Sequence, residues 1–184
     1  QGGDDSDFVS GGGGDDTLTG GAGDDILIGG EGSDIVDGDG GSDIAMFSGS
    51  LSDYTVTVEA GALTVTDSAG DADTLYGVET LRFDDGDIAV SLDTNGLVLT
   101  GSAGADSIKI VGSVPVTVNG SGGDDVLTGI DGTDTITGGA GSDTITGGQG
   151  VDVAVFAGNQ ADYTFASSQD GLTIMVTHVS TGDA

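Results

Sequence analysis

Aspartate is the residue type in this chain that could do chemistry, and it recurs at a fixed spacing. From Gly11 the sequence reads GGGGDDTLT, GGAGDDILI, GGEGSDIVD and GDGGSDIAM, and Gly2 to Ser10 keep the same nine-residue frame. A second array, GSGGDDVLT, GIDGTDTIT, GGAGSDTIT and GGQGVDVAV, begins at Gly120, and GSAGADSIK at Gly101 is a separate copy. All of these blocks follow the template G-G-x-G-x-D-x-U-x, in which U is apolar.

Aspartate holds the sixth place of each block, and an apolar residue holds the eighth. The sixth-place residues are Asp7, Asp16, Asp25, Asp34, Asp43, Asp106, Asp125, Asp134, Asp143 and Asp152. The eighth-place residues are Val9, Leu18, Leu27, Val36, Ala45, Ile108, Leu127, Ile136, Ile145 and Ala154. Aspartate is also common in glycine-rich turns for local hydrogen bonding. That explanation does not account for an aspartate that stays in step with an inward apolar residue through both arrays.

The elements that position these aspartates follow from the period. The six glycine-rich residues of a block predict a turn, and the last three predict a short strand whose central side chain points inward. Two turns and two strands close one coil of about 18 residues, so Asp16 should lie over Asp34 at roughly the 4.8 Å spacing of neighbouring strands. Stacked bare carboxylates repel. A cation between them reverses this, and carboxylate and carbonyl oxygens suit calcium better than magnesium. The sequence predicts an all-β fold, a parallel β-roll.

These blocks resemble the RTX repeats, the hemolysin-type calcium-binding nonapeptides of secreted bacterial proteins. The resemblance implies a right-handed parallel β-roll with each calcium ion held between turns one coil apart. It also implies ligation by the sixth-place aspartates and by carbonyl groups of the turns. Those carbonyl groups would belong to Gly12, Gly14, Gly21, Gly23, Gly30, Gly32, Gly139 and Gly141.

Stacking within the two arrays predicts the number of calcium sites. The pairs 18 residues apart are Asp7–Asp25, Asp16–Asp34, Asp25–Asp43, Asp125–Asp143 and Asp134–Asp152, which gives five sites. Asp106 would add a sixth, although it precedes Asp125 by 19 residues rather than 18. The intervening residues 110–119, IVGSVPVTVN, carry no carboxylate, so this turn is expected to hold no metal ion.

The repeats divide the chain into four segments. These are a first array at 1–46, a linking or capping segment at 47–100, a second array at 101–155 and the start of a second cap at 156–184. The two caps match at an offset of 109 residues, as Tyr54 matches Tyr163. Alternating runs in the first cap predict strands, and its aromatic residues Phe47, Tyr54 and Phe83 are expected to cover an open end of the roll. The match stops at Ala184, which predicts a longer protein built from such units.

Composition excludes several classes of function. The 184 residues carry a formal net charge of −30, and this self-repulsion opposes folding unless cations bind. Nucleic acids are excluded because phosphate contacts need Lys and Arg, and no apolar run is long enough to span a membrane. A single histidine, no cysteine and no G-x-S-x-G motif predict that the chain is not an enzyme.

Asp84, Asp85 and Asp87 are either a further cation site or a solvated acidic turn.

The resemblance implies a module that is exported unfolded by a type I secretion system and folds in extracellular calcium. The 109-residue unit favours a structural spacer in a large adhesin or surface-layer protein at the bacterial cell surface, which would reach cell-surface or matrix ligands through its parent. The alternative is the non-catalytic C-terminal region of a secreted protease, lipase or polysaccharide-modifying enzyme.

Overall fold

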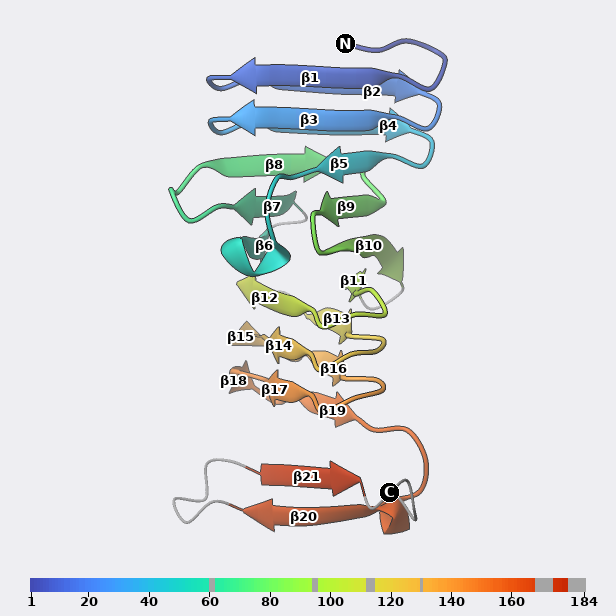
Figure 1. Ribbon diagram of the computed structural model, residues 1–184, viewed down its shortest axis with the longest axis vertical. Coiled ribbons are helices and arrows are strands. Elements are labelled where there is room, and N and C mark those ends of the chain that lie inside the picture. Colours follow the sequence, from blue (N-terminus) through green and yellow to red (C-terminus); the bar gives the residue numbers. More distant parts are fainter. Residues whose placement is uncertain (60–61, 94–95, 112–114, 130, 168–173, 179–184) are drawn as a thin grey trace.

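Two long sheets run side by side through both arrays and the segment that joins them in the computed structural model (Figure 1). The structure describes residues 1–59, 62–93, 96–111, 115–129, 131–167 and 174–178. The larger sheet has the strand order β1-β3-β5-β9-β10-β11-β13-β16-β19, and the other has the order β17-β14-β12-β6-β7-β8-β4-β2. Successive strands of an array alternate between the two sheets, so the prediction of an all-β parallel β-roll is confirmed.

The first array forms strands with the predicted repeat. They are β1 (Phe8–Gly13), β2 (Thr17–Ala22), β3 (Ile26–Glu31), β4 (Ile35–Gly40) and β5 (Ile44–Met46). Strand β1 pairs in parallel with β3, β2 with β4, and β3 with β5, so that Leu18 lies beside Val36 and Leu27 beside Ala45. Each partner is one coil further along the chain, as the period predicts.

The linking segment extends both sheets. It contains the 3-10 helix η1 (Leu51–Asp53), β6 (Thr55–Glu59), β7 (Ala62–Thr66), β8 (Ala72–Tyr76), β9 (Thr80–Phe83), β10 (Gly86–Asp93) and β11 (Gly96–Thr100). Strand β8 pairs in parallel with β4, and β9 with β5, so these two strands add one coil to the first array. Antiparallel pairs then lead from β8 through β7 to β6 and from β9 through β10 to β11. The segment is thus a bridge with strands of an array on both sides, where the sequence suggested a cap over an open end.

The second array follows on from this bridge. Its strands are β12 (Ser107–Val111), β13 (Val116–Asn119), β14 (Val126–Thr128), β15 (Asp131–Gly132), β16 (Thr135–Thr137), β17 (Thr144–Thr146), β18 (Gln149–Gly150) and β19 (Val153–Val155). Strand β6 pairs with β12 and β11 with β13, both in parallel. Ser107 lies beside Val126, a shift of 19, because the coil of the interruption holds one extra residue. Residues 112–114 of that interruption lie outside the described residues.

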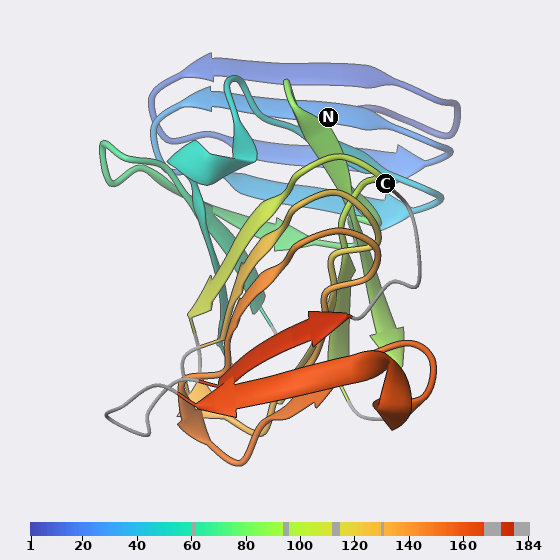
Figure 2. The same ribbon diagram turned by 60° about the horizontal axis from the view of Figure 1, so that its bottom comes forward.

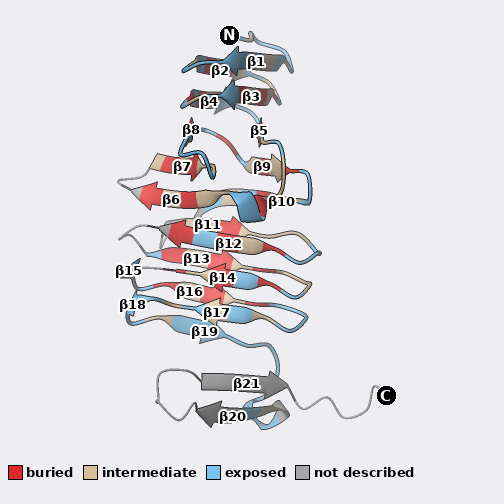
Figure 3. Ribbon diagram, turned by 60° about the vertical axis from the view of Figure 1, so that its left-hand side comes forward, coloured by how far each residue is buried: buried red, intermediate tan, exposed pale blue. Residues whose placement is uncertain are grey.

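The eighth-place side chains form the centre of the core. Leu18, Leu27, Val36, Ala45, Ile108, Leu127 and Ile136 are each at most 2% exposed. Val9 and Ile145 are half-buried, and Ala154 is exposed. These three residues lie in the first or last coils, where a neighbouring coil is present on one side only. Figure 3 shows the same gradient, with buried residues in the middle strands and an exposed β19.

A small aromatic cluster packs where the linking segment begins. The ring of Phe47 stacks on that of Phe83 with centroids 5.2 Å apart, and Tyr54 lies within 5.6 Å of both. The Tyr54 hydroxyl donates to the Ser48 carbonyl at 2.6 Å. In the second copy, Phe156 and Tyr163 pack at 5.5 Å, and the Tyr163 hydroxyl donates to the Ala157 carbonyl. The match at 109 residues is therefore a repeated local structure.

The chain continues beyond the second array into a separate two-stranded sheet. After η2 (Gln160–Asp162), β20 (Tyr163–Ser167) pairs antiparallel with β21 (Ile174–His178). Figure 2, which looks toward this end, shows the hairpin in front of the coils of the second array. The rest of the second cap, 168–173 and 179–184, lies outside the described residues. No helix of the described part of the chain has the length and apolarity needed to cross a membrane.

Candidate metal sites in the turns

The sixth-place aspartates stack in two columns, one on each side of the roll. In each column a backbone N–H donates to one carboxylate oxygen of the aspartate in the next coil. Asp7 N–H donates to Asp25 Oδ1 at 2.7 Å, Asp16 N–H to Asp34 Oδ1 at 2.8 Å, and Asp25 N–H to Asp43 Oδ1 at 2.9 Å. In the second array, Asp125 N–H donates to Asp143 Oδ1 at 3.1 Å and Asp134 N–H to Asp152 Oδ1 at 3.0 Å. All five predicted pairs are thus stacked.

The second carboxylate oxygen, Oδ2, has no hydrogen-bond partner in several of these aspartates. Oδ2 is buried and has no hydrogen-bond partner in Asp16, Asp25, Asp34, Asp43 and Asp125. Four of the five side chains, all but Asp16, are at most 1% exposed. A buried unpaired oxygen of a charged group is costly unless a cation or a donor meets it. These oxygens are the strongest physical indication of bound cations in the described part of the chain.

Several of these Oδ2 atoms lie close to a backbone carbonyl oxygen of the next coil. A methyl group on Gly11 would lie 2.6 Å from Asp16 Oδ2 and 2.7 Å from the carbonyl oxygen of Gly29, the first residue of a block one coil on. The same arrangement recurs at Gly20, where Asp25 Oδ2 and the Gly38 carbonyl oxygen meet, and at Gly120, with Asp125 Oδ2 and the Gly138 carbonyl oxygen. A carboxylate oxygen and a carbonyl oxygen facing one space are the donor set that calcium takes.

The close approach of oxygens at these first-place glycines is a feature that sequence reasoning missed. A Cβ atom at this position would occupy the space between the two oxygens, which only glycine leaves open. The signal was present in the sequence, because glycine holds the first place of every block. The resemblance implies ligand carbonyl groups at the second and fourth places, and that assignment stays a prediction. Those residues, Gly12, Gly14, Gly21, Gly23, Gly30, Gly32, Gly139 and Gly141, lie in the same turns, with φ between +96° and +133°.

Sequence reasoning also missed two acidic residues of the linking segment. Asp34 N–H donates to Asp73 Oδ1 at 2.9 Å, and Asp43 N–H donates to Glu79 Oε2 at 2.9 Å. Asp73 and Glu79 thus continue the two columns by one coil. The spacing of the repeat hid them, because they follow their partners by 39 and 36 residues instead of 18. Each lies two residues before a buried leucine, Leu75 or Leu81, as in the repeat.

Two positions in the second array depart from the pattern. Asp106 N–H donates to Asp125 Oδ1 at 2.8 Å, which continues the column, but Ser102 N–H donates to Asp106 Oδ2 at 2.8 Å. Its carboxylate therefore already has donors on its own side of the turn. In the interruption, the sixth place is Val116, which is 5% exposed and donates its N–H to Asp134 Oδ1 at 3.2 Å.

Burial of the carboxylates changes their acidity in the absence of metal. The pKa values of Asp43, Asp106, Asp125 and Asp134 are raised, first because burial penalises the charged form. Neighbouring charges add to the effect, such as Asp25 for Asp43 and Asp106 for Asp125. Burial, followed by the charge of Asp34, raises the pKa of Asp73 to about 6. Each raised pKa means that the folded chain favours the protonated carboxyl group over the bare carboxylate.

Three acidic residues of the linking segment, Asp84, Asp85 and Asp87, each have a protein partner. Asp84 Oδ2 accepts from Gly49 N–H at 3.0 Å, Asp85 Oδ1 accepts from Leu51 N–H at 2.9 Å, and Asp87 forms an ion pair with Arg82 at 2.8 Å. These contacts favour the reading of a structural acidic turn. Within the described ranges, no group of three or more Asp, Glu, His or Cys side chains is placed to hold a metal ion. A cation in this roll would therefore depend on backbone carbonyl groups.

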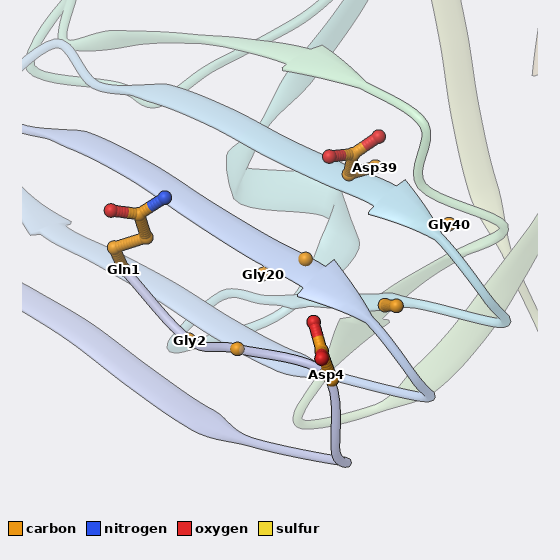
Figure 4. Close-up of a pocket in the computed structure, with 9 residues that line it drawn as sticks. Gln1, Gly2, Asp4, Gly20, Asp39 and Gly40 are labelled. Atoms are coloured by element: carbon orange, nitrogen blue, oxygen red, sulfur yellow. The ribbon is translucent and has the colours of Figure 1, made fainter.

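One hollow lies at the first coil (Figure 4). Its volume is about 370 Å³, and Gln1, Asp4, Asp39 and the glycine backbone of neighbouring turns line it. It has no aromatic wall and no pair of side chains with the character of an acid and a base. It is a groove between turns.

A comparison with protein families finds the same repeats. A family model described as the RTX calcium-binding nonapeptide repeat (4 copies) matches residues 1–36, 10–45 and 119–154. No curated protein sequence matches the chain. Among solved structures, the extracellular lipase LipA from Serratia marcescens matches at 22% identity and a TM-score of 0.45, over 92% of this chain and 34% of the lipase chain. This chain thus spans about a third of that lipase, and the likeness says nothing about activity. The matched residues, together with the two columns of stacked aspartates, show that both arrays contain RTX calcium-binding nonapeptide repeats.

Proposed function

We propose that this chain is a calcium-triggered folding module of a secreted bacterial protein, with calcium held between turns one coil apart. The sixth-place aspartates would be the acidic ligands, and glycine carbonyl groups of the same turns would complete the sites. The observation that carries the proposal is the set of five buried Oδ2 atoms without a partner. The glycine-rich turns of the repeats contain no Lys or Arg that could neutralise these oxygens.

Calcium would supply the energy that the chain itself lacks. Without the ion, the net charge of −30 and stacked buried carboxylates oppose the coil. The core is also thin, because one inward side chain per strand must hold each coil. An ion that binds the folded coil and not the unfolded chain stabilises it by linkage. Extracellular calcium modules bind with Kd of about 10⁻⁴ to 10⁻³ M. Calcium outside the cell, but not the low calcium of a cytosol, would then fold the chain.

Two kinds of parent protein fit such a module. The repeated structure around Tyr54 and Tyr163 supports a spacer in a large adhesin or surface-layer protein, because stacked units lengthen a rod. The alternative is the non-catalytic region of a secreted protease, lipase or polysaccharide-modifying enzyme. In both cases, hydrolysis by this chain alone should not exceed background.

Far-UV circular dichroism during a calcium titration tests the proposal. The protein in chelator should give the spectrum of a disordered chain, and millimolar-range calcium should produce a strand signal. Magnesium at the same concentration is the control. It should produce little change, because it requires tight octahedral geometry and keeps its waters. A strand signal that is already complete in chelator would contradict the proposal.

A further inference from the structure

The coil that the linking segment adds to the first array places Glu79 where the repeat has an aspartate. Asp43 N–H donates to Glu79 Oε2 at 2.9 Å, just as Asp25 N–H donates to Asp43 Oδ1 at 2.9 Å one coil earlier. Leu81 follows Glu79 by two residues and is 0% exposed, in the position that Ala45 has after Asp43. Glu79 therefore continues this column of carboxylates outside the nonapeptide motif.

Asp43 also has an oxygen available for a ligand on this side. The residue is 0% exposed, and its Oδ2 atom has no hydrogen-bond partner. A methyl group on Gly38 would collide with both Asp43 Oδ2 and the carbonyl oxygen of Gly77. These two oxygens converge as Asp25 Oδ2 and the Gly38 carbonyl oxygen do at Gly20. Gly77 thus has the position of a first-place glycine, although it belongs to no repeat.

A glutamate suits this coil because its turn is short. Gly77 precedes Glu79 by two residues, whereas Gly38 precedes Asp43 by five. The side chain of glutamate is one methylene longer than that of aspartate, so it can reach the column from a backbone held further away. Gly77 also has φ of +55°, which favours glycine at the point where the shortened turn begins.

We propose that Asp43, the Gly77 carbonyl group and Glu79 hold one further calcium ion, beyond those of the nonapeptide repeats. This inference rests on the proposed function, because it applies the same donor set to a new position. An ion at this site would bind residues of both the first array and the linking segment, and would therefore stabilise the contact between them. The hairpin β6–β7 lies between β5 and β8 in the chain, and the ion would close that insertion at its base.

Counting bound calcium ions tests the proposal. Equilibrium dialysis with radioactive calcium should give one ion fewer for Glu79→Gln than for the unmodified chain. Glu79→Asp should also lose one ion, because it keeps the charge and shortens the reach. Glu31→Gln is the matched control, since Glu31 is exposed on β3 and its change removes the same charge. It should bind as many ions as the unmodified chain.

Two further measurements make the outcomes distinct. Glutamine keeps a carbonyl oxygen that can accept from Asp43 N–H, so circular dichroism in saturating calcium should show a folded Glu79→Gln chain. If Glu79→Gln retains every ion at unchanged affinity while Asp25→Asn loses at least one, the Glu79 site is wrong and the repeat sites stand. If the unmodified chain binds no calcium, the proposed function itself fails.

Discussion

In Asp25, Asp43 and Asp125 the two carboxylate oxygens have different roles. Oδ1 accepts a backbone N–H from the preceding coil, as Asp25 does from Asp7, and this fixes the side chain. Oδ2 then points into the turn without a partner, beside a glycine carbonyl oxygen. The hydrogen bond therefore positions one oxygen so that the other can serve as a ligand.

Replacing Asp25 tests this division of roles. Asp25 takes part in two stacked pairs, with Asp7 and with Asp43. Asp25→Asn keeps the shape but loses the charge, so we expect a higher calcium midpoint of folding, by about tenfold for each 1.4 kcal/mol of binding lost. Circular dichroism during calcium titration measures it. Asp87→Asn is the control, because exposed ion pairs such as Asp87–Arg82 contribute about 0–1 kcal/mol. An equal shift in both variants would be evidence against the assigned sites.

The first-place glycines give a second prediction at this scale. A Cβ atom in Gly20→Ala would collide with Asp25 Oδ2, so calcium affinity should fall even though no ligand is removed. Gly13→Ala is the matched control, since nothing lies within 4 Å of its Cβ position. Isothermal titration calorimetry should show weaker binding for Gly20→Ala and little change for Gly13→Ala. Unchanged binding in both would mean that the space beside Asp25 Oδ2 is not a cation site.

At the scale of elements, the arrays could be predicted, whereas the linking segment could be predicted to contain strands but not how these strands pair. The nine-residue phase sets the turns, the strands and the pairing register, because each coil depends only on its neighbours. The linking segment has no period, and its strands β8 and β9 join the roll through partners 39 and 36 residues away. No local pattern specifies such distant pairing. The D-x-L motif at Asp73 and the E-x-L motif at Glu79 match the D-x-U part of the repeat. Their place in the two columns follows only from the pairing of β4 with β8 and of β5 with β9.

If the linking segment is a true coil, its leucines must be part of the core. Leu81 of β9 is 0% exposed. Leu81→Ala should therefore lower the free energy of unfolding by about 2–5 kcal/mol, as for other buried leucines. Urea unfolding in saturating calcium measures the change. The control is Ile35→Ala on strand β4 of the other sheet, where the side chain is 47% exposed and the cost should be much smaller. A Leu81→Ala cost no greater than that of Ile35→Ala would contradict the assignment.

For the whole molecule, charge decides stability. Only Arg82 and Lys109 oppose 32 acidic residues, so the folded roll concentrates negative charge that the unfolded chain can spread apart. Protons and calcium ions are two ways of neutralising it. They compete, because calcium binds ionised carboxylates.

This competition predicts opposite pH responses with and without calcium. The pKa of Asp73 is raised from 3.8 to about 6, so the folded chain holds more protons than the unfolded one between these values. The stability of the calcium-free chain should therefore fall as pH rises from about 4 to 6. Circular dichroism of calcium-stripped protein should show more residual strand signal at pH 5 than at pH 7, and Asp73→Asn should reduce the difference. In millimolar calcium the order should reverse. A calcium-free chain indifferent to pH would contradict this reasoning.

The position of the ions themselves tests the central claim most directly. Crystals grown in calcium should give anomalous difference peaks inside the turns. Each peak should lie about 2.3–2.6 Å from a sixth-place carboxylate oxygen and from a glycine carbonyl oxygen. The peaks should follow the two columns of stacked aspartates. Ordered coils whose turns contain water instead of calcium, with the buried Oδ2 atoms meeting other donors, would contradict the account.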